Sequence, residues 1–223
     1  MNTTHQGILT AGQITAYATS ALGAQYRTHI FLILIIKNVA RLIRWDRGGA
    51  VVTAPIDYDK EPFLLDFLIC YNYASPEARG HDVTVGSITN DEDREVRMLP
   101  DFALAKSLLV ITMPDSHQPQ ETNRYVVCGP SARPDIPAGR WTRASIAYDL
   151  RRKKHILLKD SWRVLLDGIM PEGDVYTLLH KYGVPNIPLC SCFGDVGDDT
   201  YHKSRTHEFI GKHNTLLSLL TPH

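Results

Sequence analysis

The clearest structural signal in this sequence is a strand followed directly by a sharply bounded helix, within residues 155–183. Residues 155–162 are a short, mostly apolar run with turn-like flanks, which is typical of a β-strand buried in a sheet. The helix is expected to begin near Pro171 and to end before Gly183. Proline favours the first helical position, and glycine favours the position after the last turn.

The predicted helix has an apolar stripe that is expected to be buried. It consists of four side chains at helical spacing, Val175, Leu178, Leu179 and Tyr182. Glu172 lies one turn before the stripe and in line with it, so its carboxylate is expected to point inward and to need a cationic partner. Lys159, at the end of the preceding strand, is the candidate. We expect its nitrogen to lie within about 4 Å of the Glu172 carboxylate.

A strand lysine paired with a glutamate on the next helix is the arrangement with which protein kinases position the phosphates of ATP. The candidate catalytic residues are therefore Lys159 and Glu172. The same spacing also occurs in ordinary α/β chains, where it gives a surface ion pair without a chemical role. Spacing alone leaves both interpretations open.

The strings around this pair, LLKDSWR, EGDVYTLLH and GVPNIP, resemble the fungal-type protein kinase family, the kinase-like proteins of mushroom-forming fungi. Earlier strings resemble the same family, in particular QYRTHIFLILI, ARLIRWDRGGAVVTAPIDY and ASPEARGHDVTV. The resemblance covers residues 12–85 and 139–209. It implies an N-terminal region followed by a kinase-like small lobe, and it implies ATP as the cofactor.

The turn that should cradle the phosphates departs from the family. The resembled family carries Gly-Arg-Gly-Thr-Arg-Gly, whereas this chain reads Gly139-Arg140-Trp141-Thr142-Arg143-Ala144. The candidate ATP-binding residues are Gly139, Arg140 and Lys159. Only glycine lets backbone N–H groups close on phosphates. Because Trp141 is bulky and two glycines are replaced, ATP binding is expected to be weak or absent.

No His-Arg-Asp loop occurs in the sequence, nor an Asp-Phe-Gly in the order that a kinase needs. Asp101-Phe102-Ala103 is similar to the latter but precedes Lys159, so we interpret it as a coincidence. Residues of this chain therefore do not support a Mg²⁺ site, and no other metal site is expected.

Two functional hypotheses follow. The first is a fungal-type protein kinase relative, truncated before its catalytic loop and without phosphotransferase activity of its own. The alternative is a non-enzymatic protein-interaction module built on a kinase-like small lobe. Both predict a protein partner or self-association, because a lone small lobe leaves an apolar face uncovered.

Composition restricts the class of protein further. The 24 lysines and arginines balance the 24 aspartates and glutamates, so no charge excess indicates binding to nucleic acid or to a membrane. The longest apolar run, Ile30–Ile36, is too short to span a bilayer, and the N-terminus lacks the pattern of a signal peptide. Four cysteines do not make a disulfide scaffold in a chain of 223 residues. A cytoplasmic or nuclear location is expected.

The fold class is expected to be α+β, with an N-terminal region at residues 1–122 and the small lobe at residues 123–223. The first region should form a helix, an antiparallel meander and a second helix, at residues 8–24, 29–53 and 60–73. Because Ile30–Ile36 is apolar throughout, we expect it to be buried on both faces. The polar stretch 114–123 is interpreted as the linker between the regions.

The small lobe is expected to be an antiparallel sheet with one long helix. Strands are predicted at residues 125–128, 144–148 and 155–162, with a further strand at 187–194. Before the linker, a strand is predicted at residues 107–113.

Three arginines surround a tryptophan in the meander, Arg41, Arg44, Arg47 and Trp45. One interpretation is a basic-aromatic patch for phosphate or a partner, and a third functional hypothesis is a nucleic-acid binder that uses these residues. The interpretation we favour is that Asp46 and nearby acids neutralise the arginines at the edge of a sheet. Trp45 is expected to be at least partly buried.

Overall fold

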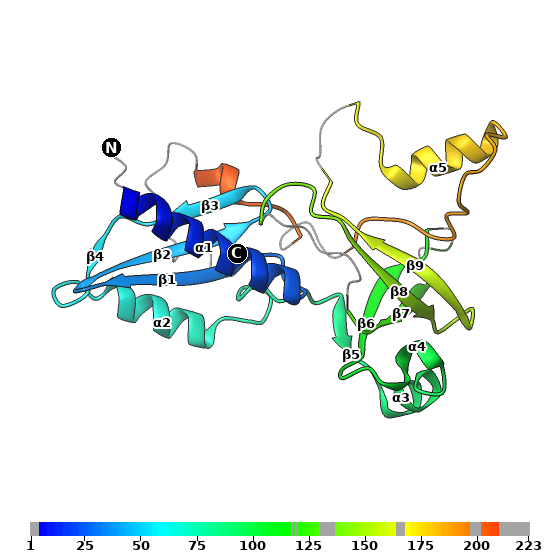
Figure 1. The fold of residues 1–223 in the computed structure, drawn as a ribbon, viewed down its shortest axis with the longest axis horizontal. Coiled ribbons are helices and arrows are strands. Elements are labelled where there is room, and N and C mark those ends of the chain that lie inside the picture. Colours follow the sequence, from blue (N-terminus) through cyan, green and yellow to red (C-terminus); the bar gives the residue numbers. More distant parts are fainter. Residues whose placement is uncertain are drawn as a thin grey trace. The chain divides into compact units, whose positions relative to one another are not determined.

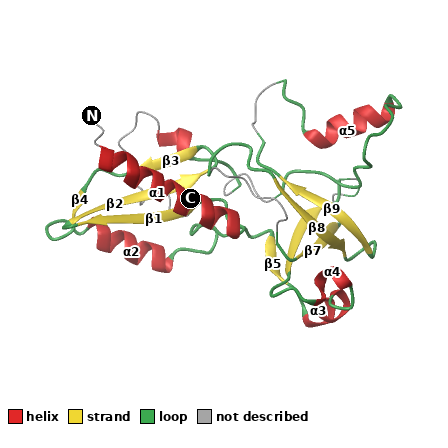
Figure 2. Ribbon diagram, in the orientation of Figure 1, coloured by secondary structure: helices red, strands yellow, loops and turns green. Residues whose placement is uncertain are grey.

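The structure is a computed structural model that describes residues 5–116, 118, 120–129, 137–163, 168–196 and 202–209. It has an α+β fold with antiparallel sheets (Figure 1 and Figure 2). No helix within these residues is long and apolar enough to cross a membrane. The chain divides into two compact units. The described part of the first unit is residues 5–83, 137–141 and 202–209, and the rest belongs to the second.

This division differs from the boundary expected at residues 122 and 123. β6 (Leu109–Pro114) and β7 (Thr122–Val127) form an antiparallel pair along their whole lengths. The polar stretch 114–123 therefore runs from the end of one paired strand into the next, inside the second unit. Turns within a domain and linkers between domains are both polar because both are exposed to water. The polar composition of this stretch therefore did not show which of the two it is.

Two helices and a four-stranded antiparallel sheet make up most of the first unit (Figure 1). In chain order they are α1 (His5–Ala24), β1 (Ile30–Ile36), β2 (Val39–Asp46), β3 (Gly49–Val52), β4 (Ile56–Asp57) and α2 (Phe63–Tyr73). The strand order is β1-β2-β3, and β4 pairs with β2. The predicted order of helix, meander and helix is confirmed, and Trp45 is half-buried as expected.

A two-residue loop fixes the register of the β1–β2 hairpin. Only Lys37 and Asn38 connect the two strands, and Lys37 has a φ of 54°, in the left-handed region. Because so short a loop determines which residues face each other, Ile33 lies opposite Leu42.

The core of the first unit lies between α2 and the sheet. Leu42, Ile56 and Phe67 are buried there, with Phe31 and Tyr71 packed around them. The Phe31 ring lies 5.5 Å from the Phe67 ring and 5.9 Å from the Tyr71 ring. These contacts place α2 beside β1.

The prediction that Ile30–Ile36 is buried on both faces is wrong. β1 is an edge strand, which pairs only with β2 among the strands that the structure describes. The Ile33 and Ile35 side chains are 39% and 57% exposed. An apolar run reports the composition of a strand, whereas burial depends on which elements cover it, and these lie elsewhere in the sequence.

The segment after α2 turns back onto the start of β1. Gly80 has a φ of 89°, and its carbonyl accepts a hydrogen bond from the Thr28 N–H at 3.0 Å. A Cβ atom at Gly80 would lie 2.1 Å from the His29 carbonyl oxygen, so only glycine fits. His81 forms a β-bridge with Arg27 and so helps to hold the turn.

The segment 202–209 also belongs to the first unit. It contains the short 3₁₀ helix η1 (Thr206–Phe209), whose first N–H groups point at the buried Asp46. The Asp46 carboxylate accepts hydrogen bonds from the Arg205 N–H at 2.8 Å and the Thr206 N–H at 3.1 Å. The Thr206 hydroxyl adds a third bond at 2.6 Å, and Phe209 packs on the core.

The second unit is a five-stranded antiparallel sheet with the order β5-β6-β7-β8-β9. Besides β6 and β7, its strands are β5 (Val85–Ser87), β8 (Arg143–Asp149) and β9 (Lys154–Asp160). Its helices are α3 (Asn90–Val96), α4 (Pro100–Ala103) and α5 (Glu172–Lys181). The strands predicted at residues 107–113, 125–128, 144–148 and 155–162 are confirmed, as is the helix between Pro171 and Gly183.

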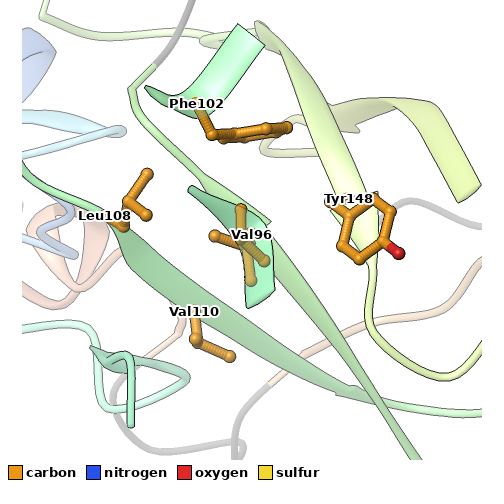
Figure 3. Close-up of a cluster of buried hydrophobic side chains, with 6 residues drawn as sticks. Val96, Phe102, Leu108, Val110 and Tyr148 are labelled. Carbon is orange, nitrogen blue, oxygen red and sulfur yellow. The ribbon is translucent and has the colours of Figure 1, made fainter. Parts of the chain in front are cut away.

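A cluster under α3 and α4 forms the core of this unit. It consists of six buried side chains, of which Figure 3 labels all but Val126: Val96, Phe102, Leu108, Val110, Val126 and Tyr148. A capping box at Thr89 and Glu92 begins α3. Phe102 is completely buried, so the Asp-Phe-Ala string is part of a hydrophobic core, which agrees with our interpretation of it as a coincidence.

Three expectations for the last part of this unit are wrong. β9 is an exposed edge strand rather than a buried one. The apolar stripe of α5 is largely exposed, including Val175, Leu178 and Tyr182, and Figure 1 shows this helix standing apart from the sheet. Residues 187–194 form no strand. The helical pattern was read correctly, but its apolar face has no sheet against it in the described chain.

Candidate functional site

Lys159 and Glu172 meet as predicted. The Lys159 Nζ lies 2.5 Å from Glu172 Oε1 and 2.7 Å from Oε2, so the ammonium group contacts both carboxylate oxygens. Lys159 comes from the end of β9, and Glu172 is the first residue of α5. The two side chains are 46% and 37% exposed. At that exposure an ion pair contributes at most about 1 kcal/mol to stability, so its main effect is on orientation.

A close backbone contact positions Glu172. The next residue, Gly173, is buried, and a Cβ atom there would lie 1.9 Å from the Phe193 ring. The coil after α5 therefore returns and packs against the first turn of the helix. His180 Nε2 lies 3.1 Å from the Pro188 carbonyl oxygen and holds the other end of this return.

Pairing with β8 positions Lys159. Lys159 lies opposite Ala144, and one pair further along, Arg143 lies opposite Asp160. The Arg143 side chain is buried, and its Nε donates to Asp160 Oδ2 at 2.9 Å. Arg143 is therefore occupied by a structural ion pair, although the sequence placed it in the candidate phosphate turn.

The other predicted ATP-binding residues belong to the first unit. The Gly139 N–H donates to the Arg47 carbonyl oxygen at 2.9 Å, and Arg140 is exposed. Trp141 is buried, with the Arg47 guanidinium 3.9 Å from the centre of its ring. Gly139 and Arg140 thus lie in one unit and Lys159 in the other, where it pairs with Glu172.

Several residues of the predicted phosphate turn are held in other contacts. A phosphate turn needs backbone N–H groups that converge on an open space. Here the Gly139 N–H is already bonded, and the side chains of Trp141 and Arg143 are buried in other contacts. Within the described residues, no group of three or more His, Cys, Asp and Glu side chains could hold a metal ion.

On one face of the second sheet, exposed apolar side chains lie next to the Lys159–Glu172 ion pair. Val110, Val126 and Tyr148 lie side by side on this face, under α3 and α4. Two residues further along, and so on the same face, Ile146 lies opposite Leu157. These side chains are 49% and 75% exposed. We call them the Ile146–Leu157 pair. The next pair on this face contains Lys159, so the exposed apolar pair lies between the core and the ion pair.

Sequence reasoning missed a polar cluster in the second unit. The buried carboxylate of Asp115 accepts hydrogen bonds from Asn123 Nδ2 at 3.0 Å and from Arg152 at 3.2 Å. Arg152 also donates to the buried Asp149 at 3.1 Å, and this hydrogen bond raises the pKa of the guanidinium. Arg151 adds a contact to Asp115 at 3.3 Å. Because both carboxylates meet guanidinium groups, the cluster joins two hairpin loops and is not an open binding site.

The arginines around Trp45 do not form an exposed basic patch. Arg44 is buried and bonds to Asp46, as favoured above, but it lies on the central strand β2 and not at the edge of a sheet. Arg41 donates to the Thr53 carbonyl oxygen at 2.7 Å, and Arg47 is buried against Trp141. Burial acts to raise the pKa of Asp46, but the charge of Arg44 and the hydrogen bonds at the carboxylate lower it below its ordinary value. These arginines stabilise the first unit.

Comparisons with family models, with curated proteins and with solved structures give no match to this chain.

Proposed function

We propose that the second unit is a kinase-like small lobe that binds a protein partner and does not transfer phosphate by itself. The family resemblance of the strings around Lys159 and Glu172 motivates this proposal. The observation that carries it is the two-oxygen contact between Lys159 and Glu172. It connects the third strand of an antiparallel meander, β7-β8-β9, to the start of the next helix, and protein kinases also pair a strand lysine with a glutamate of the next helix.

In this proposal the ion pair holds α5 in place and does not position a nucleotide. The residues that would complete a phosphate site are bonded elsewhere, as described above. The exposed Ile146–Leu157 pair and the exposed side chains of α5 supply an apolar surface on either side of the ion pair. Such a surface with a charged border is typical of a site for protein binding.

Nucleotide titration tests the enzymatic part of the proposal. The purified protein is titrated with ATP and Mg²⁺ by calorimetry and assayed with generic peptide substrates. We expect no turnover and little or no heat of binding. Lys159→Met is the test variant, and Lys154→Met on the same strand is its matched control. Turnover that disappears in Lys159→Met and persists in Lys154→Met would overturn the proposal.

Proximity labelling, compared between the wild type and two variants, tests whether the second unit binds a protein partner through this surface. Leu157→Lys puts a charge into the apolar surface, whereas Ile36→Lys changes an exposed side chain on the edge strand of the first unit. A partner of the second unit should be labelled by the wild type and by Ile36→Lys but lost with Leu157→Lys. If Leu157→Lys retains every partner, this surface is not the binding site.

A further inference from the structure

β1 has an unprotected edge. Among the described residues, no backbone hydrogen bond reaches Ile30–Ile36 from any element except β2. Edge strands are usually protected from pairing by charged side chains, proline, bulges or short length. β1 has none of these, because its seven residues read IFLILII and pair with β2 without interruption.

The exposed surface beside this edge is apolar. Ile33, Ile35 and Ile36 are exposed on the strand itself. On the neighbouring helix α2, the outward side chains are also apolar and exposed, including Leu65, Leu68 and Ile69. β1 therefore has no charged side chain that would keep another strand away, and α2 carries only one, Asp66.

We propose that β1 pairs in antiparallel orientation with β1 of a second copy of this chain, with Ile33 opposite its own counterpart. This inference concerns the first unit and does not depend on the function proposed for the second. Pairing two copies would join two four-stranded sheets into one continuous sheet.

Backbone geometry selects this register. In a hairpin with a two-residue loop, the residues next to the loop form a hydrogen-bonded pair, here Ile36 and Val39. Hydrogen-bonded pairs alternate with pairs whose N–H and C=O groups point outward. Phe31, Ile33 and Ile35 therefore present the free groups at the edge. When Ile33 lies opposite Ile33 of the other copy, Phe31 lies opposite Ile35 of the other copy. Each residue with free backbone N–H and C=O groups then lies opposite another such residue.

A second copy suits this edge better than an unrelated strand. Two-fold pairing places a sequence against itself, and this is unfavourable wherever like charges meet. The seven residues of β1 carry no charge, so no such conflict arises. The two-fold axis is perpendicular to the sheet and leaves each face on the same side. Both copies of α2, with their exposed apolar side chains, then lie on one face of the joined sheet.

Sedimentation of charge variants tests this proposal. The wild type is expected to sediment as a dimer at about 100 μM and to dissociate on dilution. Ile33→Lys and Ile33→Glu each place two like charges directly opposite one another, which should weaken dimerisation at least about tenfold. An equimolar mixture of the two variants should restore the dimer, because each lysine then meets a glutamate. Leu104→Lys, at an exposed position of the second unit outside both surfaces, is the matched control and should remain dimeric.

The outcomes separate the parts of the proposal. A wild-type monomer at about 100 μM, or variants that stay dimeric, would overturn pairing through β1. Two monomeric variants whose mixture stays monomeric would overturn the register at Ile33. A loss of dimer with Leu157→Lys alone would assign self-association to the second unit. Rescue in the mixture also shows that both variant chains are folded.

Discussion

At the residue scale, His29 is a buried side chain that ought to make stability depend on pH. Its ring lies between the Thr28 hydroxyl and the Ala78 carbonyl oxygen, each 3.0 Å from a ring nitrogen. Burial, assisted by the charge of Arg44, lowers the pKa of His29 from 6.5 to about 3. The folded protein therefore keeps this ring neutral at a pH where the unfolded chain binds a proton.

We expect the free energy of unfolding to fall as the pH decreases below 6.5, through the window that ends near 3. Because the folded pKa is the lower one, the unfolded state gains a proton in this window, at about 1.4 kcal/mol per pH unit. Urea denaturation between pH 7.5 and pH 5 measures the slope. His29→Gln should reduce the slope. Equal slopes in the wild type and His29→Gln would contradict this assignment.

At the scale of elements, local signals predicted the helices and strands but not what covers them. The two-residue loop between β1 and β2 acts on its immediate neighbours, and so do the proline and the glycine that flank α5. These turns and helix ends could therefore be predicted from the sequence. The exposure of β1 and β9 depends on the absence of a further strand beside each among the described residues, and no local pattern in the sequence predicts this. The Lys159–Glu172 contact was predictable because it joins consecutive elements. The cluster around Asp115 was not, because it joins two separate hairpin loops.

The contact between Gly173 and Phe193 gives an element-scale prediction. Gly173→Ala should destabilise the protein by about 1–3 kcal/mol, because the new methyl group cannot share the space of the Phe193 ring. Gly12→Ala in α1 is the matched control. It has no atom within 4 Å of its new Cβ and should stabilise the helix by up to about 1 kcal/mol.

Urea denaturation measures both changes. Hydrogen exchange should show that residues 187–196 lose protection only in Gly173→Ala. The double variant Gly173→Ala/Phe193→Ala relieves the overlap and should recover part of the loss. If Gly173→Ala alone is neutral, the coil does not pack on the helix as described.

At the scale of the whole molecule, each unit has its own core, but the chain passes through the first unit three times. The segment 202–209 completes the first unit by donating to the buried Asp46. The sequence did not indicate this, because an aspartate and the helix start that it caps lie 160 residues apart.

Thr206→Val should therefore weaken the first unit and leave the second unchanged. It removes the hydroxyl bond to Asp46 and leaves a buried carboxylate with one partner fewer, at a cost of about 1–3 kcal/mol. Hydrogen exchange should show faster exchange in β2 and β3, with β7 and β8 unaffected. Thr177→Val in α5, which also loses a hydroxyl bond, is the matched control. Equal effects on both sheets would show that the units are not independent.

The position of residues 202–209 has a consequence for the order of folding during synthesis. All described residues of the second unit leave the ribosome before Thr206 does, so that unit can form its complete core while translation continues. The first unit begins to emerge earlier, yet until Thr206 and Phe209 have emerged its Asp46 carboxylate lacks most of its hydrogen-bond donors. The half of the protein that is made first is therefore finished last, and in the interval its apolar β1 edge is available to neighbouring nascent chains.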